Sequence, residues 1–164
     1  MNRRFFTRAI VLLAVLTLPF GRMHAQAGKL PPFRMMQASG KLYKAENLPM
    51  GKPILIIYFS PDCEHCQKFM KDFFQKTNNF KKASVVMITY LPVEKLAQFN
   101  KDFSVQKFSN LYTGTEGTSF FVRNYYNIMQ MPFTALYDKN GNFITSYSRD
   151  IPLNDLSKKL NSLN

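Results

Sequence analysis

The stretch from Ile54 to Phe74, ILIIYFSPDCEHCQKFMKDFF, constrains the fold of this 164-residue chain more than any other part of it. It opens with a continuous apolar run that predicts a buried strand, and a Ser-Pro-Asp tripeptide ends that strand. The residues that follow place apolar side chains on one face of a helix: Cys66, Phe69, Met70, Phe73 and Phe74. Cys63 and Cys66 are the only cysteines, and they lie where the strand ends and the helix begins.

A cysteine pair with this spacing is either a static disulfide or a redox-active dithiol. Two cysteines are too few for a multi-bridge secreted scaffold or for a zinc site with four cysteine ligands. A disulfide that closes so short a loop removes little chain entropy and adds little stability. A helix N-terminus, in contrast, carries partial positive charge and free N–H groups that stabilise a thiolate. The pattern therefore favours a redox-active dithiol formed by Cys63 and Cys66.

The first 27 residues predict a secretory signal peptide, which leaves residues 28–164 as the mature domain. Basic residues precede an apolar run from Ala9 to Leu18, and Ala27 ends a small-x-small motif, with cleavage after Ala25 as a close competitor. The apolar run is short for a membrane span, so we expect cleavage rather than retention as an anchor. The segment has no cysteine that could carry a lipid. We therefore expect an exported protein, periplasmic or secreted.

The charge of the chain indicates which partners to expect. The formal net charge is +12, but the basic residues are scattered singly or in pairs. Because no clustered stripe or recognition motif is visible, a solvated basic surface is favoured over a nucleic-acid interface. We expect no nucleic-acid partner and a monomeric protein.

The rest of the chain predicts alternating strands and helices. In order, the expected elements are a hairpin over 33–43, a strand over 54–59, a helix up to about 76, a strand over 83–91, a helix over 92–103, a short strand within 106–113, a loop over 113–118, a helix over 119–129, strands over 133–137 and 143–147 joined by an Asn-Gly turn, and a helix over 152–163. In the helix over 119–129, four side chains are expected in the core: Phe121, Val122, Tyr125 and Met129. This order predicts an α/β fold with a central mixed sheet and helices on both faces.

From about residue 33 to residue 164 the chain resembles thioredoxin-fold proteins, and among them it is most similar to the exported TlpA-like redoxins. The resemblance rests on the Cys63-Glu64-His65-Cys66 motif between strand and helix, and on the Met-Pro dipeptide that precedes the strand over 133–137. It implies a thioredoxin-like fold with an N-terminal hairpin and a strand–helix unit inserted between the cysteines and Pro132.

The resemblance also implies a role for individual residues. Cys63 matches the exposed attacking cysteine, and Cys66 matches the buried resolving cysteine. Pro132 matches the family's cis-proline, which lies beside the cysteines, and the backbone of Met131 then pairs with a substrate chain. The implied partners are protein thiols and disulfides and a membrane or periplasmic electron donor. No cofactor is implied.

Two positions depart from the family pattern. Asp62 stands where the family often has tryptophan, and Ile57 stands where thioredoxins carry a buried acid that helps to deprotonate the resolving thiol. Asp62 is a candidate cap for the helix, but its charge and that of Glu64 oppose a nearby thiolate. His65 can supply positive charge or a hydrogen-bond donor. We therefore expect these three polar residues to tune the dithiol, and water, Glu64 or another group to take the proton of Cys66.

The sequence thus predicts an exported thiol–disulfide oxidoreductase that works through a mixed disulfide, with reduction of protein disulfides preferred. His65 argues for a more oxidising pair, so the direction stays open. Two alternatives also stay open. Cys63, Cys66 and His65 could bind a soft metal such as Cu(I), with Met70 or Met131 nearby. The chain could also be a redox-inert, thioredoxin-like interaction domain.

Overall fold

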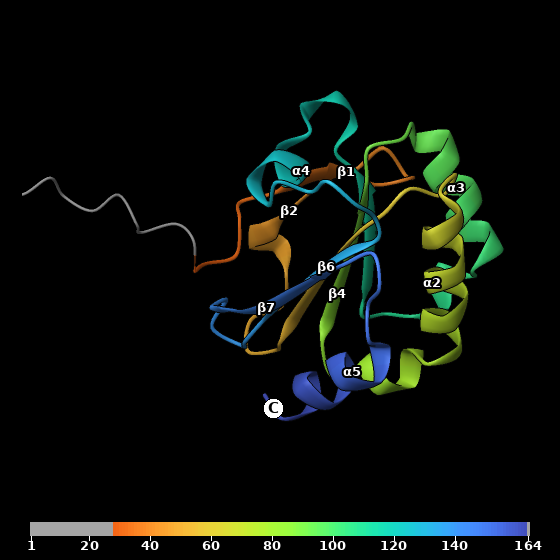
Figure 1. Cartoon of the computed structure of the whole chain (residues 1–164). Coiled ribbons are helices and arrows are strands. Elements are labelled where there is room, and N and C mark those ends of the chain that lie inside the picture. The colour runs from red at the N-terminus through yellow and green to blue at the C-terminus, as the bar shows by residue number, and fades with distance from the viewer. Residues whose placement is uncertain (1–27, 164) are drawn as a thin grey trace, which may run out of the picture.

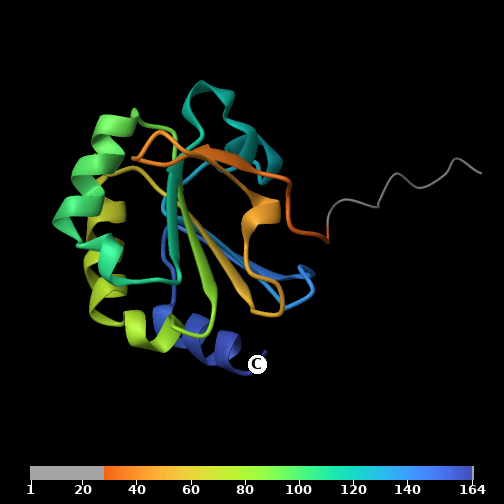
Figure 2. The same cartoon turned by 180° about the vertical axis from the view of Figure 1, so that it is seen from behind.

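The computed structural model describes residues 28–163 (Figure 1, Figure 2), so the expected signal peptide and both candidate cleavage sites lie outside the described residues. The strands are β1 Arg34–Met36, β2 Leu42–Lys44, β3 Ile54–Tyr58, β4 Ser84–Thr89, β5 Leu111–Thr115, β6 Phe133–Tyr137 and β7 Phe143–Ser148. The α-helices are α2 Glu64–Gln75, α3 Val93–Asp102, α4 Phe121–Tyr125 and α5 Leu153–Asn161. Short 3-10 helices are η2 Ala45–Asn47, η3 Thr77–Phe80, η4 Val105–Lys107 and η5 Gly117–Ser119. Within residues 28–163, no helix is long and apolar enough to cross a membrane.

The seven strands form one mixed sheet in the order β2-β1-β5-β4-β3-β6-β7. The three strands β3, β4 and β5 run parallel, whereas β6 pairs antiparallel with both β3 and β7. The hairpin of β1 and β2 extends the sheet beyond β5 through antiparallel pairing. Between α3 and β6, the chain adds β5 and α4. These features confirm the expected mixed sheet, the N-terminal hairpin and the inserted strand–helix unit.

The two faces of the sheet carry different cores. On one face, here called the helical face, α2, α3 and α5 cover a core rich in phenylalanine: Phe59, Phe69, Phe73, Phe80 and Phe99. The opposite face, here called the tyrosine face, is covered by α4 and by the segments around the hairpin. Its tyrosines are Tyr58 and Tyr137, which are fully buried, and Tyr43, Tyr90, Tyr112 and Tyr126, which are partly buried. Figure 1 shows α2 and α3 on one side of the sheet and α4 on the other. Helices therefore lie on both faces, as predicted.

The prediction for residues 106–118 places the limits of the strand and of the loop wrongly. The short strand is β5, Leu111–Thr115, so the first three residues of the expected loop belong to the sheet. At Gly114 a glycine is required because β1 crosses closely there: a Cβ atom on Gly114 would lie 2.4 Å from the side chain of Met35. This glycine permits close packing of two strands and does not mark a turn.

The prediction of a helix over 119–129 is also wrong, because α4 contains only five residues, Phe121–Tyr125. Phe120 and Asn127 have φ angles of 45° and 50°, and a right-handed helix cannot continue through such residues. Val122 is buried as expected, but Met129 is 81% exposed and Ile128 takes the core position instead. Phe121 is 39% exposed and Tyr125 is partly buried.

A buried carboxylate holds α4 in place. The side chain of Glu116 accepts hydrogen bonds from the backbone N–H of Val122 at 2.7 Å and of Arg123 at 3.4 Å. It also accepts the hydroxyl of Tyr58 at 2.7 Å. Tertiary contacts of one side chain therefore position this short helix, in addition to its own propensity.

Candidate active site

Both cysteines follow strand β3 and lie at the carboxyl ends of the parallel strands. Open α/β sheets bind their ligands at this end of the strands. The N–H of Cys63 donates to the carbonyl oxygen of Ser60 at 3.1 Å, and this turn leads directly into α2. Cys63 is the N-cap residue of α2 and is half-buried, whereas Cys66 has no exposed surface. The apolar spacing of α2 explains the difference, because Cys66 lies on the stripe that packs on the sheet. One thiol thus reaches solvent while the other lies beneath it.

The environment of Cys66 keeps its thiol protonated. Burial, together with a smaller effect of the neighbouring Cys63, raises the pKa of Cys66 from 9.0 to about 12. A weak donor acts against this effect, since the N–H of Ser60 lies 3.5 Å from Cys66 Sγ. Ile57, which stands where thioredoxins carry a buried acid, is fully buried in the helical-face core. The Cys66 thiol therefore needs a proton acceptor from elsewhere before it can act as a nucleophile.

The loop before β6 lies between the two cores. The Met131–Pro132 peptide bond is cis, as the resemblance implies. Met131 is partly buried and packs against both cores, and Cys63 lies at the margin of the helical-face core. The carbonyl oxygen of Pro132 accepts the N–H of Arg149 at 2.7 Å, which ties the loop to the end of β7.

Asp62 does not cap α2, so that expectation is wrong. No side chain caps this helix, and the Asp62 carboxylate instead forms an ion pair with Lys95 of α3 at 3.1 Å. Both side chains are a little over half exposed. Because Lys95 balances its charge, Asp62 opposes a thiolate at Cys63 less than an unpaired carboxylate would. Glu64 is exposed in the first turn of α2.

His65 contacts an arginine that the sequence did not single out. The guanidinium of Arg149 lies 3.4 Å from Nε2 of His65. Because a guanidinium can only donate, Nε2 of His65 is the acceptor in this contact. Arg149 therefore places a positive charge next to the histidine that stands between the two cysteines. No sequence pattern identifies Arg149, since it follows β7 in a left-handed conformation with φ of 65°.

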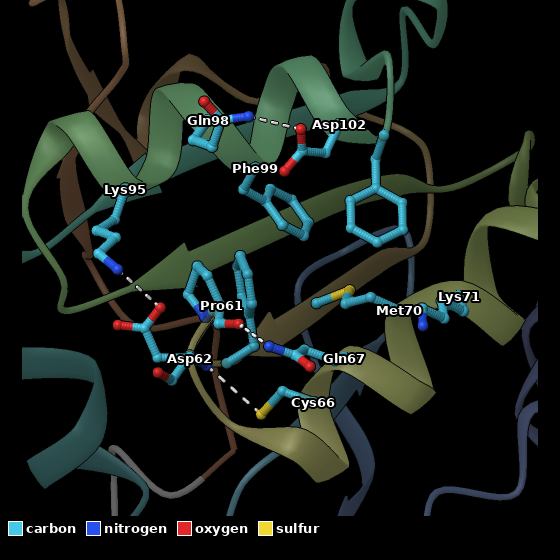
Figure 3. Close-up of a pocket in the computed structure, with 13 residues that line it drawn as sticks. Pro61, Asp62, Cys66, Gln67, Met70, Lys71, Lys95, Gln98, Phe99 and Asp102 are labelled. Atoms are coloured by element: carbon cyan, nitrogen blue, oxygen red, sulfur yellow. Dashed lines mark hydrogen bonds and ion pairs between the residues drawn. The ribbon is translucent and has the colours of Figure 1, made fainter.

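A cavity of about 480 Å³ opens between α2 and α3, beside Cys66 (Figure 3). Its apolar wall is formed by Phe59, Met70, Phe99 and Phe103. Its polar wall is formed by Asp62, Gln67, Lys71, Lys95, Gln98 and Asp102. Buried thiol, apolar surface and charged side chains thus meet in one space that solvent can enter.

The described residues do not assemble a larger metal-ligand set. Among residues 28–163, no group of three or more His, Cys, Asp or Glu side chains is placed to hold a metal ion. Cys63, Cys66 and His65 therefore do not form such a group. Met70, named as a further soft ligand, is buried in the helical-face core.

Comparison with known proteins identifies the family. A sequence family described as a thioredoxin-like domain matches residues 42–164, which is most of the chain. No curated protein matches the chain.

Three solved structures illustrate the likeness in fold. DsbF of Mycobacterium tuberculosis is 20% identical, with a TM-score of 0.67 over 81% of this chain and 96% of that chain. A secreted M. tuberculosis disulfide oxidoreductase homologous to E. coli DsbE is 18% identical, with a TM-score of 0.66 over 80% and 96% of the two chains. The exposed lipoprotein thioredoxin Etrx1 of Streptococcus pneumoniae is 18% identical, with a TM-score of 0.62 over 81% and 100%. The family match covers strands β2 to β7, the cysteine pair and the cis-proline loop, and the chain belongs to the thioredoxin-like family.

Proposed function

We propose that this protein is an exported thiol–disulfide oxidoreductase that reduces disulfides in other proteins through Cys63 and Cys66. The observation that carries the proposal is the unequal exposure of the two thiols at the start of α2. Cys63 is accessible to a substrate, and Cys66 lies directly beneath it with no exposed surface. Membership of a family whose proteins are typically oxidoreductases supports the same reading.

The reaction proceeds in two exchange steps. The thiolate of Cys63, stabilised by the N-terminus of α2, attacks a substrate disulfide and forms a mixed disulfide. Cys66 then attacks Cys63, the substrate leaves as a thiol, and a Cys63–Cys66 disulfide remains. In this scheme the backbone of Met131, before the cis Pro132, is the surface along which the substrate chain lies.

Several groups around the cysteines set the direction of the reaction. Glu64 destabilises a thiolate at Cys63, and the raised pKa of Cys66 keeps the second thiol protonated. Both effects disfavour the ionised dithiol that makes a pair strongly oxidising. Arg149, close to His65, acts in the opposite sense. We infer that the first two effects prevail and that the pair is reducing.

Export, the partners and the oligomeric state belong to the same proposal. The signal-peptide pattern of residues 1–27 supports export. Two of the similar structures are described as a secreted oxidoreductase and an exposed lipoprotein thioredoxin. A reductase outside the cytoplasm requires an electron donor, which we place in the membrane or the periplasm. We expect the protein to act as a monomer without a cofactor.

The experiment that tests this proposal traps the intermediate. The Cys66→Ser variant should form a mixed disulfide with a protein disulfide substrate, because the resolving thiol is missing. The Cys63→Ser variant should form none and should lose all measurable turnover. Non-reducing electrophoresis and mass spectrometry identify the adduct. If Cys63→Ser retains full activity, or if Cys66→Ser traps no substrate, the chain is not an oxidoreductase of this kind.

A further inference from the structure

The resolving step needs a base that the helical-face core does not contain. Burial holds the proton on Cys66 with a pKa of about 12, and the side chain of Ile57 beneath it cannot accept a proton. The inference below rests on the proposed function, since it concerns the step in which Cys66 attacks the mixed disulfide.

The cavity between α2 and α3 gives the Cys66 thiol a route to solvent. Cys66 lines this cavity of about 480 Å³, which has room for several water molecules. The charged side chains facing the cavity are Asp62, Lys71, Lys95 and Asp102. Neither Glu64 nor His65 lines it, so these neighbours of the cysteines do not reach Cys66 by this route.

Of the two carboxylates, only Asp62 belongs to the end of the cavity that contains Cys66. Asp62 lies in the loop that connects β3 to α2, two residues after Ser60, whose N–H contacts Cys66 Sγ. Asp102 lies at the other end of α3, where its carboxylate accepts a hydrogen bond from Gln98 at 2.6 Å. Figure 3 shows Asp62 and Lys95 together on one side and Asp102 on the other, with Phe99 between them.

The ion pair with Lys95 fixes the Asp62 carboxylate at the cavity. The two charged groups are 3.1 Å apart and join the loop before α2 to α3. Lys95 and Lys71 carry only donors and cannot accept a proton, but their charge favours a thiolate at Cys66. The cavity thus combines a buried acid, a carboxylate acceptor and compensating cations.

We propose that Asp62, held over this cavity by Lys95, accepts the proton of the Cys66 thiol through cavity water during the resolving step. The S–H bond of Cys66 breaks, and its proton passes through water to the Asp62 carboxylate. The Cys66 thiolate attacks Cys63 Sγ and forms the Cys63–Cys66 disulfide, while the bond from Cys63 to the substrate sulfur breaks. The substrate sulfur leaves as a thiolate and takes a proton from solvent or from Asp62. The cysteine pair is oxidised and the substrate is reduced.

Stopped-flow kinetics with an excess of an aromatic disulfide that releases a coloured thiolate isolates this step. Attack by Cys63 gives a first phase whose rate depends on reagent concentration, and resolution by Cys66 gives a second phase whose rate does not. In Asp62→Asn, the second phase should slow roughly a hundredfold near neutral pH, the lower end of what a general base contributes. Asp102→Asn, the matched control on the same cavity, should leave it unchanged.

The pH profile distinguishes proton acceptance from a structural role. Without the acceptor, the thiol must ionise by itself, so the second phase of Asp62→Asn should rise about tenfold per pH unit below the pKa of Cys66. The wild-type profile should be shallower. Lys95→Gln breaks the ion pair but keeps the carboxylate, and it should slow the phase only a few-fold. All three substituted side chains are exposed, so these variants should fold.

Two results overturn the proposal. The first is an Asp62→Asn variant whose second phase has the wild-type rate and pH profile. The second is an equal decrease of the second-phase rate in Lys95→Gln and Asp62→Asn, which would assign the effect to the ion pair. Both results leave the two-step exchange by Cys63 and Cys66 intact. A wild-type protein that shows no second phase at all contradicts the proposed function as well.

Discussion

The helical face and the tyrosine face of the sheet each carry a buried core, but different interactions hold the two cores together. The helical face packs phenylalanine rings against one another, as in the contacts of Phe73 with Phe69, Phe74 and Phe80. The tyrosine face buries hydroxyls that must find partners: Tyr58 donates to Glu116, and the hydroxyls of Tyr126 and Tyr137 bond to each other.

This difference explains where the chemistry lies. The core around Cys66 is built of apolar side chains, and the polar groups near its thiol are Cys63 and those that line the cavity. The polar network of the tyrosine face is already satisfied internally and serves to anchor α4 through Glu116. A core made mainly of aromatic and aliphatic side chains can surround a reactive thiol with few groups that compete for its proton.

The largest expected effect is on the helical face. Phe73 is fully buried among other rings, so Phe73→Ala should destabilise the protein by about 3–5 kcal/mol through lost burial and a residual cavity. Urea denaturation measures the change. The control is Phe121→Ala on α4, which removes a ring that is 39% exposed and should cost less than about 1 kcal/mol. Equal losses in the two variants would show that the helical face is not close-packed.

The next effect tests the polar anchor of the tyrosine face. Glu116→Gln keeps the shape of the side chain but removes the charge that accepts from Tyr58 and from the backbone at Val122. We predict a loss of about 1–3 kcal/mol, with faster hydrogen exchange confined to α4. Glu64→Gln, at an exposed position, should change stability by no more than about 0.5 kcal/mol. If α4 exchanges no faster in Glu116→Gln, Glu116 does not hold it.

The third effect depends on pH and belongs to the reduced protein. Because burial raises the pKa of Cys66 from 9.0 to about 12, the folded chain keeps a proton that the unfolded chain loses above about pH 9. The stability due to the neutral thiol is therefore complete below that pH and is lost as the pH rises toward 12. The free energy of unfolding should fall faster than in Cys66→Ala, by at most about 1.4 kcal/mol per pH unit.

Buried tyrosines also make the stability depend on alkaline pH, in wild type and in Cys66→Ala alike. Burial raises the pKa of Tyr43 and of Tyr137 to about 12, and it also raises the pKa of Tyr58 and Tyr126. These residues are the same in both proteins, so their alkaline effects cancel in the difference. Parallel curves for wild type and Cys66→Ala would contradict a buried, neutral Cys66.

The smallest effects should have opposite signs on the two faces. The hydroxyl of Thr134, beside Ile57 on the helical face, is buried and has no hydrogen-bond partner within the described part of the chain. Thr134→Val should therefore stabilise the protein, by up to about 1 kcal/mol. Tyr126→Phe removes a hydroxyl paired with Tyr137 and should destabilise it by about 1 kcal/mol. Thermal unfolding shows whether each variant is more or less stable than the wild type. If both substitutions change the stability in the same direction, the proposed distinction between the two faces is wrong.

The sequence predicted the parts of the fold that have strong local periodicity. The buried strand β3, the amphipathic helix α2 and the Asn-Gly turn before β7 carry that signal themselves, and each was found where expected. The helix over 119–129 is shorter than predicted because its limits depend on left-handed residues such as Phe120. They also depend on Glu116, whose carboxylate is bonded to Tyr58, 58 residues away in the sequence. Gly114 resembled a loop residue because the strand that crosses it, β1, is far away in the sequence.

In the candidate site, too, local sequence patterns identify residues but not their distant partners. The cysteine pair and Pro132 could be named from local motifs. The sequence identifies Asp62 as a candidate cap, but its partner Lys95 lies 33 residues away, and the carboxylate forms an ion pair instead. Arg149 was missed because only the end of β7 brings it to His65, 84 residues away in the sequence. Long-range pairing of charged side chains is not encoded in periodicity, so it had to come from the structure.

The reduction potential of the Cys63–Cys66 pair tests the central claim most directly. The mature chain is equilibrated in a series of defined thiol buffers, and the fraction of disulfide is measured after acid quenching and thiol labelling. A reducing dithiol predicts a single two-electron transition near the potential of thioredoxin, about −270 mV. A potential near that of DsbA, about −120 mV, or a pair that does not titrate at all would contradict the account.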